Sequence, residues 1–187
     1  MIDNIDIFEN FLSPEECNLI LNKCKGELTL ETAKVYNNKN SKNNENTHRK
    51  SSIGWISDLG FVNERLMSKL RESFNINGME VTNLGHFQFT EYKKNEYFNW
   101  HTDANNDAYR DRFASIVIQL NDTYKGGVLE IKNLKEEIVP IENKIGTLYI
   151  FNSRLLHRVA PVVEGVRYSL VNWISLVKID SKKQNLI

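Results

Sequence analysis

A histidine and an aspartate lie two residues apart in the segment NWHTD, as His101 and Asp103. On a β-strand, side chains two residues apart point to the same face, so this imidazole and this carboxylate would be neighbours. His157 could supply a third ligand from a distant strand. Two imidazoles and one carboxylate on one side of a ferrous ion leave positions open for a bidentate co-substrate and O2. The alternative is a surface pair, with His157 as a histidine of the core.

An arginine follows His157 by ten residues, as Arg167 in the segment GVRYS. The two-residue period of a strand would place Arg167, Ser169, Val171 and Trp173 on one face. A guanidinium that points into the interior of a β-fold needs a carboxylate partner, and the distal carboxylate of 2-oxoglutarate would be one. The alternative is an arginine on the surface of an edge strand.

These residues need a fold that brings distant strands together. From residue 80 onward, short runs rich in Val, Ile, Phe and Tyr recur with turn residues between them. The pattern is typical of a β-sandwich or jelly roll. We expect strands near residues 80–92, 97–103, 113–120, 127–132, 136–140, 146–151, 156–160 and 166–177.

The first part of the chain predicts two helices packed outside one sheet. Ser13 can cap a helix that begins at Pro14, and Glu16 would complete a capping box. A second amphipathic helix is expected over roughly residues 58–74, because apolar residues recur there at helical spacing.

The segment between the two helices contains an asparagine-rich loop. Residues 28–36 are expected to be extended, and a strand is expected near residues 51–56. The loop at residues 37–50 has six Asn between Asn37 and Asn46 and is too long for a plain hairpin turn. It is either a functional lid or a disordered surface loop.

The composition argues against several classes of partner, although a local basic patch could still bind nucleic acid. Among 187 residues, 24 Lys and Arg balance 24 Asp and Glu, so no broad electrostatic attraction to nucleic acid or anionic lipid is expected. No signal peptide and no apolar run of about 18 residues are found. Cys17 and Cys24 lie seven apart on one expected helix, which is poor disulfide geometry. We expect a cytoplasmic protein of one domain with no membrane or nucleic-acid partner, and the oligomeric state is left open.

Three stretches carry a family resemblance: QFTEYKKNEYFNWHTD, RFASIVIQLNDTYKGGVLEI and GTLYIFNSRLLHRVAPVVEGVRYSLVNWI. From about residue 87 to 174 the sequence resembles the prolyl 4-hydroxylase branch of the Fe(II)/2-oxoglutarate-dependent oxygenases. The resemblance implies a mostly β fold with flanking α-helices, a double-stranded β-helix (jelly roll) supported by two N-terminal helices. We expect a single domain over 1–187, with helical support and lid loop in 1–79, the catalytic core in 80–178 and a short tail in 179–187.

The resemblance also implies catalytic roles. His101, Asp103 and His157 would be the iron ligands, and Arg167 would bind the C5 carboxylate of 2-oxoglutarate. Tyr92 matches a tyrosine that family members place against the co-substrate. Ser169, which shares a strand face with Arg167, is also assigned to co-substrate binding. O2 would be consumed, succinate and CO2 released, and ascorbate is a candidate reductant.

One departure from the family concerns the co-substrate. Several prolyl hydroxylases carry a tyrosine on the strand before the Gly-Gly turn, where it helps to hold the C5 carboxylate. That place is Gln119 here, and its amide could still donate a hydrogen bond.

The resemblance assigns two residues to the substrate. Arg112 would hold the backbone of a peptide and Trp173 would flank a prolyl ring, while a solvated arginine and a core tryptophan are the alternatives. The leading prediction is hydroxylation of proline in a protein or peptide. The same mechanism on a free amino acid, another side chain or a small metabolite is the closest rival. A non-catalytic jelly-roll module of the cupin or lectin sort and nucleic-acid demethylation are remoter alternatives.

Overall fold

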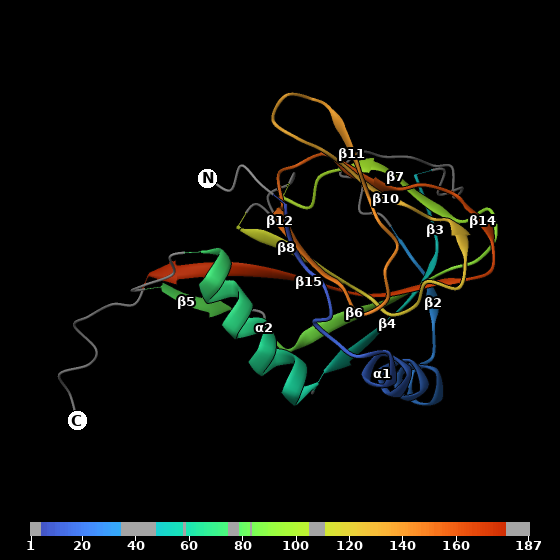
Figure 1. Ribbon diagram of the computed structural model, residues 1–187, viewed down its shortest axis with the longest axis horizontal. Helices are drawn as coiled ribbons and strands as arrows, with labels where there is room; N and C mark the ends of the chain where they lie inside the picture. Colours follow the sequence, from blue (N-terminus) through green and yellow to red (C-terminus); the bar gives the residue numbers. More distant parts are fainter. Residues whose placement is uncertain are drawn as a thin grey trace.

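The computed structural model describes residues 5–34, 48–57, 59–74, 79–82, 84–104 and 111–178. Two sheets face each other, and two helices cover the outer side of the larger one (Figure 1). The mostly β fold with two helices agrees with the jelly-roll prediction. In the described part of the chain, no helix is long and apolar enough to cross a membrane.

The larger sheet, called here the major sheet, is antiparallel and has eight strands. Its long central strand β15 pairs with β8 on one side and β6 on the other, and β5 pairs with the far end of β15. The strand order is β1 (Asp6–Phe8), β12 (Leu148–Asn152), β8 (Ala114–Gln119), β15 (Arg167–Lys178), β6 (His86–Tyr92), β4 (Ser52–Ser57) and β2 (Glu31–Thr32), with β5 (Met79–Thr82) off this path.

The smaller sheet, called here the minor sheet, has five strands and covers one face of the major sheet (Figure 1). Its central strand β13 pairs with β7 and β10. The order is β11 (Ile138–Ile141), β10 (Leu129–Lys132), β13 (His157–Val159), β7 (Tyr97–His101) and β3 (Arg49–Lys50). A separate two-stranded pair joins β14 (Val162–Glu164) to β9 (Lys125–Gly126).

The two helices begin differently. Helix α1 (Pro14–Glu27) has the predicted capping box, in which the Glu16 N–H donates to the Ser13 hydroxyl and the Ser13 N–H donates to the Glu16 carboxylate. Helix α2 (Gly60–Ser73) starts after Leu59 without a side-chain cap. The buried faces of both helices pack on the outer-facing side chains of the major sheet in one hydrophobic cluster, which includes Phe87, Phe89, Ile116 and Leu170.

The alternation of the strands divides the major sheet into two chemically different faces. Phe87 and Phe89 point to the helices, whereas Gln88, Thr90 and Tyr92 point to the minor sheet. The face toward the minor sheet is called the inner face below. It is unusually polar for a buried surface, and this makes it the place to look for function.

Some predicted elements were wrong in detail. The strand expected over 80–92 is two strands, β5 and β6, because a turn at residues 84–85, where Gly85 has a φ of +117°, separates them. The short strands β1, β3, β9 and β14 were not predicted, and β3 occupies the end of the segment predicted as a loop at 37–50. Of the loop predicted at 37–50, residues 37–47 lie outside the described residues.

Candidate active site

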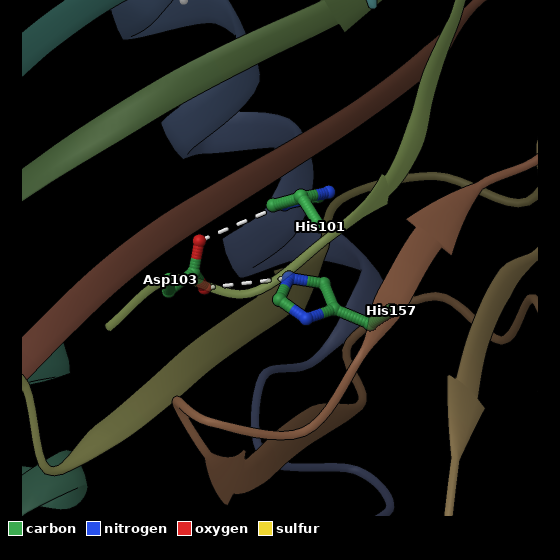
Figure 2. Close-up of side chains that lie close together, drawn as sticks. All are labelled: His101, Asp103 and His157. Carbon is green, nitrogen blue, oxygen red and sulfur yellow. Dashed lines mark ion pairs between the residues drawn. The ribbon is translucent and has the colours of Figure 1, made fainter. Parts of the chain in front are cut away.

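Three side chains converge where two neighbouring strands of the minor sheet, β7 and β13, meet at their ends. His101 ends β7, Asp103 lies two residues beyond it, and His157 begins β13, where it is paired in register with His101. The Asp103 carboxylate lies 3.6 Å from His101 Nε2 and 3.3 Å from His157 Nε2 (Figure 2). One ligand atom from each residue lies within 4.8 Å of the other two, which is the size of a shared metal site. The predicted proximity of the three residues is therefore seen.

The hydrogen bonds of the two imidazoles direct their free nitrogens toward the carboxylate. Nδ1 of His101 lies 2.7 Å from the Asn99 carbonyl, and Nδ1 of His157 lies 2.9 Å from the Leu155 carbonyl. A carbonyl can only accept, so Nδ1 carries the proton in each ring and Nε2 of a neutral ring carries a lone pair. Two such lone pairs facing a carboxylate need a cation between them. This donor set fits a divalent metal, and two His with one carboxylate suits ferrous iron.

The Asp103 carboxylate is held in its ionised form. Burial opposes this, but His157 and a 2.6 Å hydrogen bond from the Ser115 hydroxyl keep the pKa of Asp103 below its usual range. The Asp103 N–H donates to the Ser153 carbonyl, and the Ser153 and Ser115 hydroxyls are 3.0 Å apart. Burial, followed by the neighbouring His157, lowers the pKa of His101 to about 3. A neutral His101 is the form that binds a metal.

The His101 ring is held by an aromatic stack. Phe98 lies parallel to it, with ring centroids 3.5 Å apart, and the Arg49 guanidinium lies 4.6 Å from the Phe98 centroid. Arg49 also donates to the Ser51 hydroxyl and to the Gln88 amide oxygen. We did not predict either Arg49 or Phe98 from the sequence. The sequence feature that could have indicated Arg49 is its spacing from Ser51, because residues two apart in an extended segment point to the same face.

Arg167 is buried on the inner face, with 2% of its surface exposed. Its Nη1 donates to the Ser169 hydroxyl at 2.9 Å, and its guanidinium lies 5.6 Å from the Tyr92 ring centroid. Its Nε has no hydrogen-bond partner, and no ion pair to Arg167 is found within the described residues. A buried, unpaired guanidinium nitrogen is costly. An anion such as the C5 carboxylate of 2-oxoglutarate fits this position.

Gln119 does not line the pocket, because its side-chain amide is hydrogen-bonded to neighbouring groups of the protein. The Gln119 Nε2 donates to the carbonyls of Asn121 and Tyr168 and, at 2.9 Å, to the Tyr124 hydroxyl. A direct bond from Gln119 to the co-substrate therefore stays a prediction.

Tyr124, which the sequence analysis did not single out, lies beside Arg167. Burial raises the pKa of the Tyr124 phenol, whereas the positive charge of Arg167 acts to lower it. Gly127, with a φ of +59°, permits this approach, because a Cβ there would lie 3.1 Å from the Tyr124 ring and 3.2 Å from Arg167 Cδ. The phenol is thus anchored by Gln119 on one side and next to the guanidinium on the other.

Replacing Tyr124 with Phe is expected to raise the 2-oxoglutarate concentration needed for half-saturation by roughly tenfold, because a hydrogen-bonding group next to a charge is removed. Iron binding should not change. Isothermal titration with 2-oxoglutarate, at saturating Fe(II) without O2, measures the effect. Tyr97→Phe serves as a control, because Tyr97 is not among the residues that line the pocket with Arg167. Equal affinities in the Tyr124→Phe variant and the wild type would contradict a role for the phenol.

One pocket joins the three converging residues to Arg167. The predicted Tyr92, Ser169 and Trp173 line it too, whereas Arg112 lies beside it. The Arg112 guanidinium is 4.0 Å from the Trp173 ring centroid, and its Nη1 lies 3.4 Å from the Asp103 carbonyl. The remaining lining residues are Arg49, Gln88, Thr90, Phe98, Val117, Leu129, Val159 and Val171.

The fold and site define a class: a jelly-roll protein with a two-histidine, one-carboxylate metal centre and a buried arginine in the same pocket. Residues 87–175 match the family model described as the 2OG-Fe(II) oxygenase superfamily. This segment of the chain is similar to members of that superfamily, and the fold of the chain is similar to that of solved prolyl hydroxylases.

Two solved structures show the same fold. A prolyl-4-hydroxylase from Pseudomonas putida has a TM-score of 0.69 and 23% identity, covering 91% of each chain. A prolyl hydroxylase from Trichoplax adhaerens, solved with a peptide fragment of the hypoxia inducible factor oxygen degradation domain, has a TM-score of 0.72 and 21% identity, covering 92% of this chain and 84% of the other.

Curated relatives match over shorter segments. A PKHD-type hydroxylase of Synechococcus sp. (strain CC9605) is 32% identical over 81 residues, which are 42% of this chain and 36% of the relative. One from Rippkaea orientalis is 42% identical over 67 residues, which are 35% of this chain and 29% of the relative. The chain thus spans about a third of the length of these two relatives.

Proposed function

We propose that the protein is an Fe(II)/2-oxoglutarate-dependent dioxygenase that hydroxylates prolyl residues in a protein or peptide. The reaction would convert 2-oxoglutarate, O2 and a substrate C–H bond into succinate, CO2 and a C–OH group. The observation that carries the proposal is the joint placement of His101, Asp103, His157 and Arg167 around one pocket. Similarity to prolyl hydroxylases supports the substrate class.

The residues of the chain have distinct roles in this proposal. His101, Asp103 and His157 would hold Fe(II), and Arg167, oriented by Ser169 and flanked by Tyr92, would bind the distal carboxylate of 2-oxoglutarate. When bound, the metal and its co-substrate supply the activation of O2, and ascorbate is the proposed reductant. The protein contributes orientation and the exclusion of water. Arg112 and Trp173 would contact the substrate beside the metal.

A free amino acid or small carboxylic acid is the second candidate substrate. The observation in its favour is Arg49, a second buried guanidinium that lines the same pocket. A cation at that place could bind a substrate carboxylate. The peptide is the better candidate, because Arg49 already donates to Ser51 and Gln88 and lies against Phe98.

The test is competitive turnover with Fe(II), 2-oxoglutarate and ascorbate. Peptides that contain proline, their Pro→Ala versions and free amino acids would be offered together. We expect proline peptides alone to gain the mass of one oxygen atom, with one succinate formed per hydroxylation. Coupled hydroxylation of a free amino acid, with no reaction on any peptide, would refute the peptide substrate.

A further inference from the structure

A second tryptophan lies on the inner face of the major sheet, next to the pocket. Trp55 on β4 is paired in register with Gln88 on β6, and Gln88 lines the pocket. Cross-strand partners point to the same side of a sheet, so Trp55 belongs to the inner face. Yet Trp55 is 54% exposed. The minor sheet therefore leaves this part of the inner face uncovered.

The exposed ring is close to the tryptophan inside the pocket. The centroids of Trp55 and Trp173 are 6.3 Å apart, and their planes are inclined by 50°. Trp173 also contacts Arg112, whose guanidinium lies 4.0 Å from the Trp173 ring centroid. Trp173 is thus shared by the metal pocket and by an aromatic pair that reaches solvent. A large exposed aromatic side chain that continues a binding pocket is a common mark of a recognition surface.

The spacing of the two rings matches the repeat of an extended peptide. In an extended strand, residues two apart point to the same side and are separated by about 6–7 Å. A chain with one residue against Trp173 would therefore place the residue two positions away against Trp55. Beside Trp55, the Gln88 amide lines the pocket and accepts a hydrogen bond from Arg49, and it is a polar group that a peptide backbone could contact.

We propose that Trp55 forms a specificity subsite of the substrate groove, which binds an apolar or ring side chain two residues from the hydroxylated position. This inference rests on the proposed peptide hydroxylation and adds a sequence requirement to it. The occupant is an extended peptide, because the site continues the pocket that receives the target residue. A free amino acid has no second residue to place against Trp55.

The experiment uses short alanine-based peptides with one central proline. The residue two positions before or two positions after the proline is varied between leucine, phenylalanine and serine. Hydroxylated product is measured by mass spectrometry for the wild type, Trp55→Ala, Trp55→Phe and Phe61→Ala. Phe61 is the matched control, because it is a partly exposed aromatic residue on α2, which packs on the opposite face of the sheet.

For the wild type, leucine or phenylalanine at one of these positions should raise kcat/KM by roughly tenfold over serine. Trp55→Ala should abolish this preference mainly through KM, whereas Trp55→Phe and Phe61→Ala should retain it. Circular dichroism checks that the variants are folded.

The failures of the two proposals differ. If the wild type hydroxylates the peptides and Trp55→Ala keeps the full preference, the subsite is refuted and peptide hydroxylation stands. The subsite is equally refuted if the wild type shows no preference. If the wild type hydroxylates no peptide but turns over a free amino acid, the proposed substrate class is wrong, and the subsite is overturned with it.

Discussion

Replacing Asp103 with alanine is expected to remove nearly all Fe(II) binding and all succinate formation. Asp103 is the only anion among the three converging residues, and both imidazole Nε2 atoms face it. Two neutral imidazoles form a much weaker site for a hard divalent ion than two imidazoles with a carboxylate. We expect the affinity for Fe(II) to fall by two orders of magnitude or more, on the scale set by losing a metal ligand.

Equilibrium dialysis with Fe(II) under anaerobic conditions measures the loss, and conversion of 2-oxoglutarate reports activity. Glu72→Ala is the control, because it removes an exposed carboxylate on α2. It should bind iron and form succinate like the wild type. Full turnover by the Asp103→Ala protein would show that the metal centre has been assigned to the wrong residues.

The second large effect is expected at Arg167. Arg167→Ala should weaken 2-oxoglutarate binding by roughly two to three orders of magnitude, because removing one partner of a buried charged pair costs about 2–5 kcal/mol. Iron binding should be nearly intact, since Arg167 is not among the converging ligand atoms. Arg167→Lys should rescue part of the affinity, because lysine keeps the charge but loses the planar fork.

Calorimetric titration of 2-oxoglutarate into the Fe(II)-loaded protein without O2 separates the two effects. Arg71→Ala, which removes an exposed arginine from the last turn of α2, should bind 2-oxoglutarate normally. Unchanged affinity in Arg167→Ala would mean that the co-substrate is bound elsewhere.

The parts of the site that follow from strand parity could be read from the sequence. Arg167 and Ser169 are two residues apart on β15, so their shared face is fixed once the strand is recognised. Asp103 lies two residues beyond the end of β7, so its approach to His101 depends also on the bend that follows the strand. The pairing of His157 with His101 depends on the closure of the minor sheet. The alternation of side chains along a strand does not determine which residues pair across the sheet. The family resemblance supplied this pairing.

Other parts depend on long-range packing. Tyr124 precedes a glycine turn and has no strand period to mark it, yet the turn carries its ring to Arg167. The sequence does not distinguish Phe98 from other aromatic residues on strands, and only the structure shows that its ring stacks on His101. In the same way, strand β1 is three residues long and exists through its pairing with β12. Contacts between distant segments decide such features, and local propensity does not.

The central claim is that His101, Asp103, His157 and Arg167 form one Fe(II)/2-oxoglutarate centre that hydroxylates substrate. The most direct measurement is the stoichiometry of succinate and hydroxylated peptide formed by the Fe(II)-loaded wild-type protein, with the Asp103→Ala protein beside it. We expect one succinate for each oxygen atom gained by the peptide, and neither product from the variant. Peptide hydroxylation that proceeds without 2-oxoglutarate, or at the same rate without Asp103, would contradict this account.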